Sequence, residues 1–251
     1  EMCIRDSIRK ALNDFALYGE DNPTRYNLSE KQLKKLIVSE LTEIINKLTS
    51  FNHSISYYGT LEESELKRLL TKYHKPLVSN LEIPPVKQFQ IKEPTEKLVY
   101  FTDFNMVQAE ITWLAKHGLL DTTRLAKSAL FNEYFGGGMS SVVFQEIRES
   151  KALAYSSYGY FSFPKFKELP SMAGAYIVTQ ADKLDSAMYA MNQLILKMPE
   201  SESLFNSSLS ALKSQMVSDR TMPSDIASTY LSLRRQGLEK DTRKIIYPQL
   251  N

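Results

Sequence analysis

Residues 130–158 read LFNEYFGGGMSSVVFQEIRESKALAYSSY, a stretch that predicts two helices followed by a strand. The run Gly136–Gly138 ends the first helix, because three residues without a side chain favour a turn over continued helix. Either Ser140 or Ser141 then provides the N-cap of the second helix, which runs to about Lys151. The stretch therefore places a glycine turn and a helix end next to a predicted strand.

The residues around this stretch supply the rest of a sheet. Apolar and polar side chains alternate over residues 107–113 as in a half-buried strand, and residues 98–104 are also strand-like. Asp121 is the predicted cap of the next helix. Further strands are expected at about 152–163 and 173–179, and helices at about 182–198, 202–219 and 224–237. This order indicates an α+β fold in which a mainly antiparallel sheet is covered by helices.

The first part of the chain predicts a second set of elements. Its apolar spacing is typical of helices at 8–17, at about 29–48 with a break near Ser39, and at 61–74, with a half-buried strand at 53–59. Pro84, Pro85 and Pro94 then interrupt a stretch, residues 77–97, that has neither helical nor strand period. We therefore expect an extended linker at 81–97 that joins residues 1–80 to residues 98–251.

Composition narrows the choice of function. The 251 residues include 31 Lys and Arg against 29 Asp and Glu, a formal net charge of +2, and neither sign forms a block. Nucleic acid and membrane are therefore not expected as partners. No apolar run approaches the roughly 18 residues that a membrane-spanning helix needs.

Metal-ligating residues are scarce. The only cysteine is Cys3, and the histidines are His53, His74 and His117. Neither H-E-x-x-H nor its inverse H-x-x-E-H occurs, so the sequence predicts no metal ligand in this chain and favours surface or capping roles for the three histidines. Serine catalysis lacks the G-x-S-x-G elbow that would support it.

The glycine run allows three interpretations. Backbone N–H groups at a helix start bind anions, so Gly136–Gly138 could hold a phosphate. A P-loop, however, places Lys and Ser or Thr directly after its last glycine, and this chain has Met139. A tight turn between helices, or a glycine loop along which an extended peptide passes, therefore fits better.

Arg148 and Tyr155 are the candidate chemical groups. Arg148 lies near a helix end and Tyr155 stands seven residues later, on the following predicted strand. A guanidinium and a phenol can both donate hydrogen bonds to a carbonyl oxygen, or to the oxyanion that forms when water attacks it. From the residues alone the structural alternative is stronger: an arginine paired with Glu149 and a half-buried tyrosine are common.

The whole stretch 130–158 resembles the segment shared by the pitrilysin, insulinase and mitochondrial-processing-peptidase metallopeptidases. The resemblance rests on the glycine loop followed by Met-Ser-Ser, Phe-Gln-Glu-x-Arg-Glu and Leu-Ala-Tyr, and it extends over about residues 98–236. Residues 26–76 are similar to the end of a domain of the same family. The resemblance implies repeated α/β units, with residues 1–80 as the C-terminal part of one repeat and 98–251 as the start of the next. Residues 1–7 are set aside as an adapter remnant, and we expect a piece truncated at both ends.

In this family one half carries the zinc motif and a glutamate ligand, and the other half has lost them. This chain is similar to the second half, so the resemblance implies that it binds no cofactor and that zinc belongs to an N-terminal half, fused upstream or separate. Arg148 and Tyr155 fall on the family's substrate-orienting arginine and tyrosine, and Gly136, Gly137 and Gly138 on its substrate-guiding glycine loop.

The implied function is the C-terminal half of a zinc metalloendopeptidase, which binds peptide substrate and stabilises the transition state of proteolysis but is inactive alone. The alternative is a non-catalytic scaffold or partner subunit with the same fold. Arg148 and Tyr155 favour the peptidase, because a scaffold needs neither. A phosphate-binding domain that uses the glycine loop is a third option, and we expect no nucleotide binding.

Overall fold

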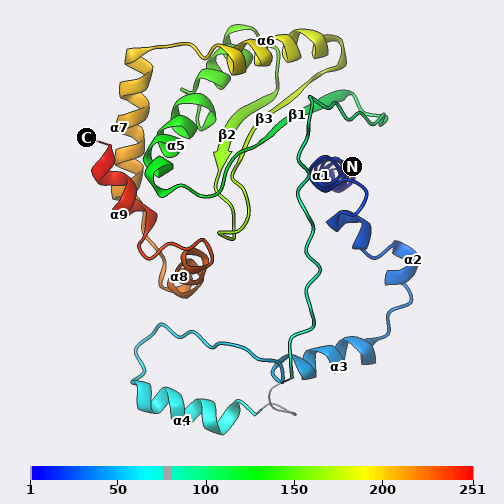
Figure 1. The fold of residues 1–251 in the computed structure, drawn as a ribbon, viewed down its shortest axis with the longest axis vertical. Coiled ribbons are helices and arrows are strands. Elements are labelled where there is room, and N and C mark those ends of the chain that lie inside the picture. The colour runs from blue at the N-terminus through cyan, green and yellow to red at the C-terminus, as the bar shows by residue number, and fades with distance from the viewer. Residues whose placement is uncertain (1, 76–80, 251) are drawn as a thin grey trace. The chain divides into compact units, whose positions relative to one another are not determined.

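The computed structural model describes residues 2–75 and 81–250 and divides into two compact units (Figure 1). Unit 1 spans Glu1–Phe104 and unit 2 spans Asn105–Asn251. The assignment of residues 1–80 and 98–251 to two family repeats stays a prediction. Residues 76–80, directly before the predicted linker at 81–97, lie outside the described residues.

Unit 2 is built on an antiparallel sheet. Among its described residues the sheet has three strands in the order β1-β3-β2, namely β1 (Gln108–Lys116), β2 (Ser156–Ser162) and β3 (Met172–Gln180). Ala175 of β3 pairs with Trp113 on one side and Gly159 on the other. This register places Trp113, Gly159 and Ala175 on one face of the sheet.

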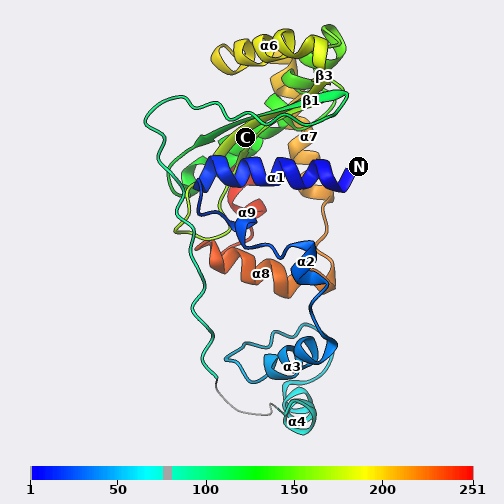
Figure 2. The same ribbon diagram turned by 90° about the vertical axis from the view of Figure 1, so that its right-hand side faces the viewer.

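One face of this sheet carries the main core of unit 2. Ala175 and Ile177 of β3 pack in one cluster with the buried face of α6 (Leu184–Leu196), which is formed by Ala187, Ala190, Met191 and Leu194. Those four positions recur every three or four residues, which is the spacing of one helical face. Val143 and Ile147, both fully buried, join the same cluster from the helical segment that precedes β2. Figure 2 shows α6 beside β3 from a second direction.

A second cluster lies between helices of unit 2. It joins α5 (Leu125–Phe131), α7 (Glu202–Ser218) and the C-terminal helix α9 (Thr242–Ile246). Its buried residues are Leu125, Ala126, Leu212 and Ile246 on these helices, and Leu238 and Leu250 outside them. The remaining α-helix among the described residues of unit 2 is α8 (Ile226–Arg235). The sequence pattern did not predict α9, which begins at a cap where the Asp241 carboxylate accepts the Arg243 N–H at 2.8 Å.

Unit 1 has a different character, because its described residues form helices and extended chain. The helices are α1 (Met2–Tyr18), α2 (Glu30–Leu33), α3 (Val38–Leu48) and α4 (Glu63–Tyr73). Helix α1 thus includes residues 2–7 of the segment 1–7 that was set aside as an adapter remnant. The extended chain is tied to α1, since the Lys92 N–H donates to the Leu17 carbonyl at 2.8 Å and the Phe15 and Tyr100 rings meet edge to face at 5.2 Å.

The α+β class and the expected helices are confirmed, with the break between α2 and α3 at residues 34–37 rather than at Ser39. Two expected strands are wrong. Residues 53–59 and 98–104 carry no strand ladder, and the described residues of unit 1 contain only an isolated parallel bridge, Phe51 with Leu81. Alternating side chains make a strand only when a neighbouring strand supplies its hydrogen bonds, and none lies beside these segments in the described structure.

Candidate functional site

The candidate residues Arg148 and Tyr155 lie on either side of one turn in unit 2. Arg148 belongs to a π-helical segment, Phe144–Ser150, and Tyr155 stands directly before β2. Ala152, between them, has a φ of 47°, and is the only residue other than glycine with positive φ in the described chain. The left-handed conformation costs an L-residue roughly 1–2 kcal/mol. The turn therefore persists because its surroundings hold it.

The bonds that hold the turn reach both the helix and the sheet. On the helix side, the Ala152 N–H donates to the Arg148 carbonyl at 3.1 Å. On the sheet side, the Thr179 hydroxyl donates to the Leu153 carbonyl at 2.6 Å and the Tyr155 N–H donates to the Val178 carbonyl at 2.9 Å. Because Thr179 is fully buried on β3, these bonds fix the backbone of the turn against the central strand.

A lysine adds a further bond to the same turn. Lys183, just after β3, donates from Nζ to the Ala152 carbonyl at 3.1 Å. The carbonyl of the strained residue is therefore satisfied by a charged donor, which forms a stronger bond than a neutral one. The sequence analysis did not identify Lys183 or Thr179. A threonine within the otherwise apolar end of β3 could have indicated a buried hydroxyl that hydrogen-bonds a neighbouring segment.

The two candidate side chains are exposed. The Arg148 side chain is 48% exposed, its Nε lies 3.8 Å from a carboxylate oxygen of Glu149, and its Cζ lies 4.8 Å from the Phe144 ring centre. Tyr155 is 76% exposed, and no described residue hydrogen-bonds its hydroxyl. No hydrogen bond or ring contact joins Arg148 to Tyr155 in the described structure. An exposed ion pair such as Arg148 with Glu149 contributes about 0–1 kcal/mol, so Arg148 keeps N–H donors available to a ligand. The exposed Tyr155 hydroxyl is likewise available as a donor.

The glycine run has unequal neighbours. A Cβ on Gly136 would collide with the backbone of Gly159 in β2, and a Cβ on Gly159 would collide with the Phe135 ring. A Cβ on Gly137 would lie 2.7 Å from the Asn132 carbonyl oxygen, whereas one on Gly138 would meet nothing closer than a Glu133 oxygen at 3.8 Å. Close packing thus requires the first two glycines, and only Gly138 has open space.

The start of the helix after the glycine run is already bonded to the protein. The Ser141 N–H donates to the Gly138 carbonyl at 3.0 Å, and the Ser141 hydroxyl accepts the Phe144 N–H at 3.4 Å. Of the two serines, Ser141 is therefore the cap. These bonds use N–H groups that a phosphate would need, which disfavours the phosphate-cradle interpretation.

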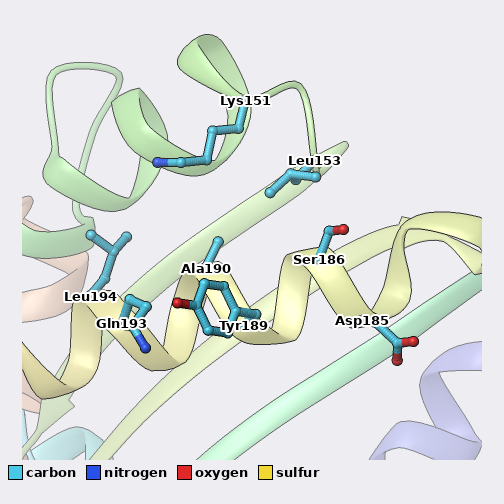
Figure 3. Close-up of a pocket in the computed structure, with 8 residues that line it drawn as sticks. All are labelled: Lys151, Leu153, Asp185, Ser186, Tyr189, Ala190, Gln193 and Leu194. Carbon is cyan, nitrogen blue, oxygen red and sulfur yellow. The ribbon is translucent and has the colours of Figure 1, made fainter.

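A hollow of about 480 Å³ adjoins the turn. Figure 3 shows Lys151 and Leu153 of the turn facing α6, from which Ser186, Ala190 and Leu194 point toward them. Lys151 is itself bound, because its Nζ lies 2.6 Å from a Glu146 carboxylate oxygen. The hollow is lined largely by apolar atoms, and neither Arg148 nor Tyr155 lines it.

Catalytic groups of other kinds do not gather in the described chain. Among residues 2–75 and 81–250, no three His, Cys, Asp or Glu side chains come together as a metal cluster. None of the described helices combines the length and apolar character needed to cross a membrane.

Comparison with known proteins places residues 35–212 against the family model of the peptidase M16 inactive domain. A search among curated proteins finds no match. Among solved structures, the chain is similar to a peptidase M16 inactive domain from Pseudomonas fluorescens, with a TM-score of 0.62 and 15% identity over 96% of this chain.

Two further structures have similar folds. The periplasmic protease PqqL from Escherichia coli gives a TM-score of 0.60 at 14% identity over 99% of this chain, and complex III2 from Candida albicans gives 0.58 at 13% over 95%. The chain covers 58% of the Pseudomonas protein, 28% of PqqL and 60% of the matched complex III2 chain. At these identities the likeness concerns the fold alone.

Proposed function

The chain belongs to the peptidase M16 inactive domain family, and we propose that it acts as the C-terminal half of a zinc metalloendopeptidase. In this proposal the chain binds peptide substrate and supplies hydrogen-bond donors to the reacting carbonyl. A zinc-carrying N-terminal half, fused upstream or separate, supplies the metal that activates water. The chain alone is then inactive.

The observation that carries the proposal is the contrast between the backbone and the side chains of the turn. The backbone from Arg148 to Tyr155 is bonded to β3 and strained at Ala152, while both candidate side chains extend into solvent. A purely structural arginine and tyrosine would be expected to make well-formed bonds inside the protein. Exposed donors on a fixed turn suit an oxyanion, because donors that are already positioned need no reorganisation during the reaction.

Each donor has a defined role in this proposal. The guanidinium of Arg148 offers several N–H groups in a fixed fork to the substrate carbonyl, and the phenol of Tyr155 offers one O–H. Both strengthen their bonds as the carbonyl oxygen gains negative charge, so their effect is larger in the transition state than in the bound substrate. Gly138 has room for a passing peptide, whereas Gly136 and Gly137 set the path of the loop.

The proposal is tested with Arg148→Ala and Tyr155→Phe in the complete protein that contains the zinc half. We expect kcat for a quenched fluorescent peptide to fall about a hundredfold or more, the size of a lost oxyanion donor, with unchanged zinc content. Tyr230→Phe is the matched control, because Tyr230 is 57% exposed on α8 and does not line the hollow beside the turn. Wild-type turnover in Arg148→Ala or Tyr155→Phe would remove that residue from the mechanism.

The alternative is a scaffold or partner subunit of the same fold without peptidase activity. The similarity to a chain of complex III2 favours it, because that chain belongs to an assembly that is not named as a protease. Peptide turnover distinguishes the two functions. A folded complete protein that binds its partner but does not hydrolyse peptides favours the scaffold.

A further inference from the structure

Two histidines of unit 1 face each other although 21 residues separate them in the chain. The Nε2 atoms of His53 and His74 lie 2.8 Å apart, and the ring centres lie 4.9 Å apart at an angle of 75°. His53 follows the bridge between Phe51 and Leu81, and His74 is the C-cap residue of α4. The pair therefore joins two segments that no regular secondary structure connects.

The hydrogen bond at Nδ1 of His53 determines that the free lone pair of the ring is on Nε2. His53 Nδ1 lies 2.6 Å from the Phe51 carbonyl oxygen, which can only accept, so Nδ1 carries the proton in the neutral ring. His53 Nε2 then presents a lone pair to His74. A ring whose Nδ1–H is held by a backbone carbonyl while Nε2 faces a partner is arranged as metal-ligating histidines are.

We propose that His53 and His74 form a two-histidine site for a divalent transition-metal ion. Moving the His74 proton from Nε2 to Nδ1 leaves two lone pairs facing each other. Two imidazole nitrogens on one tetrahedral ion stand about 3.3 Å apart, given bond lengths of about 2.0–2.1 Å. The rings therefore need to separate by about half an ångström and to turn until both lone pairs point at the same ion. His53 is exposed and His74 is partly exposed, which permits that movement.

The ion class follows from the ligands. Imidazole suits Cu²⁺, Ni²⁺ and Zn²⁺, and the affinity of such a site is highest for Cu²⁺. Because no described third His, Cys, Asp or Glu completes the group, water fills the remaining positions and the ion exchanges readily. The site is thus unlike a catalytic zinc centre, and it uses residues that the proposed peptidase function does not.

The consequence for unit 1 is a cross-link. Helices α2, α3 and α4 contain no fully buried residue, so little apolar burial holds α4 to the segment before it. An ion bound only when both rings are in place stabilises that arrangement by mass action. Metal binding is therefore expected to raise the unfolding temperature of the α3–α4 region.

The test is Cu²⁺ titration of the untagged chain in a Cys3→Ser background, which removes the thiol as a competing ligand. We expect one ion per chain by calorimetry and an electron paramagnetic resonance spectrum with coupling to two nitrogens. His53→Ala and His74→Ala each weaken binding by about tenfold or more, because the second imidazole otherwise binds intramolecularly. His117→Ala, in unit 2, leaves binding unchanged, and circular dichroism checks the helix content of every variant.

Two results would overturn the proposal. The first is a wild-type spectrum that lacks coupling to two nitrogens, which requires no variant to fold. The second is equal affinity in the wild type and in folded His53→Ala and His74→Ala chains, which would leave the pair as a hydrogen bond between two imidazoles. Neither result bears on peptide hydrolysis, so the proposed function stands or fails separately.

Discussion

Units 1 and 2 contain helices with similar apolar spacing, but the apolar faces are buried in unit 2 and exposed in unit 1. In α6 of unit 2, Ala187 and Met191 are completely buried against the sheet. In α3 of unit 1, Leu41, Ile44 and Ile45 have the same helical spacing and are 46–63% exposed. Helical periodicity thus predicts the helix in both units, but burial also needs a surface that covers the helix. Among the described residues, only unit 2 supplies a sheet as that surface.

The largest expected effect concerns this difference in burial. Ile177→Ala removes a fully buried side chain from β3 and should lower the free energy of unfolding of unit 2 by about 2–5 kcal/mol, through lost burial and a residual cavity. Denaturant unfolding followed by fluorescence measures it, because the single tryptophan, Trp113, lies on β1 and donates from Nε1 to Asn192 at 2.9 Å.

Ile44→Ala is the matched control in unit 1. Ile44 is 59% exposed, so the same change should move the unfolding of unit 2 by no more than about 0.5 kcal/mol. An equal loss in the two variants would contradict the assignment of the core to unit 2.

The next prediction tests which glycines of the run 136–138 are required for packing. Gly136→Ala should destabilise unit 2 by about 1–3 kcal/mol, since its Cβ would collide with Gly159 backbone atoms that can move only by distorting β2. Gly138→Ala, whose Cβ has open space, should change stability little. Thermal unfolding of both variants measures the contrast, and equal stability would show that Gly136 is not held by packing.

The smallest effect concerns α9, which closes the second cluster of unit 2. Hydrogen bonds from Arg243 lower the pKa of Asp241, so folding favours the ionised carboxylate. This contribution is complete above the usual titration range of an aspartate and is lost as pH falls through the lowered pKa. Asp241→Ala should therefore cost about 1 kcal/mol at pH 7, the value of a helix cap, and less in acid.

Asp225 provides the control for this prediction. It precedes α8 as the N-cap residue but makes no side-chain cap bond. Asp225→Ala should thus lower stability less than Asp241→Ala does at pH 7. The unfolding midpoint of each variant is measured at pH 7 and again at a pH below the titration range of Asp241. A cost for Asp241→Ala that does not decrease in acid would contradict the role of the carboxylate.

Local signals account for what the sequence predicted of the fold. Ser29 and Asp121 accept backbone N–H groups at their helix starts, as their residue types indicate. The period of residues 107–113 predicted β1, because alternation there coincides with a neighbouring strand, β3. The strand-like residues 98–104 have no partner strand in the described chain, and Val99 and Phe101 are 93% and 83% exposed. A strand depends on distant residues, so its period alone cannot establish it.

The candidate site was predictable in its residue types and not in its geometry. The resemblance pointed to Arg148 and Tyr155, but their roles stay predictions. The conformation of Ala152 and the bonds from Thr179 and Lys183 depend on the meeting of the turn with β3, which no local pattern signals. The π-helical form of Phe144–Ser150 was likewise missed, since its sequence is compatible with an ordinary α-helix.

Hydrolysis of a quenched fluorescent peptide in the presence of zinc tests the central proposal most directly. The chain is measured alone and then together with the zinc-carrying half, either fused upstream or added as a separate subunit. We predict no turnover by the chain alone and clear turnover by the combined protein. Peptide hydrolysis by the purified chain alone, or none by a folded combined protein, would contradict the proposal that this chain is the non-zinc half of a peptidase.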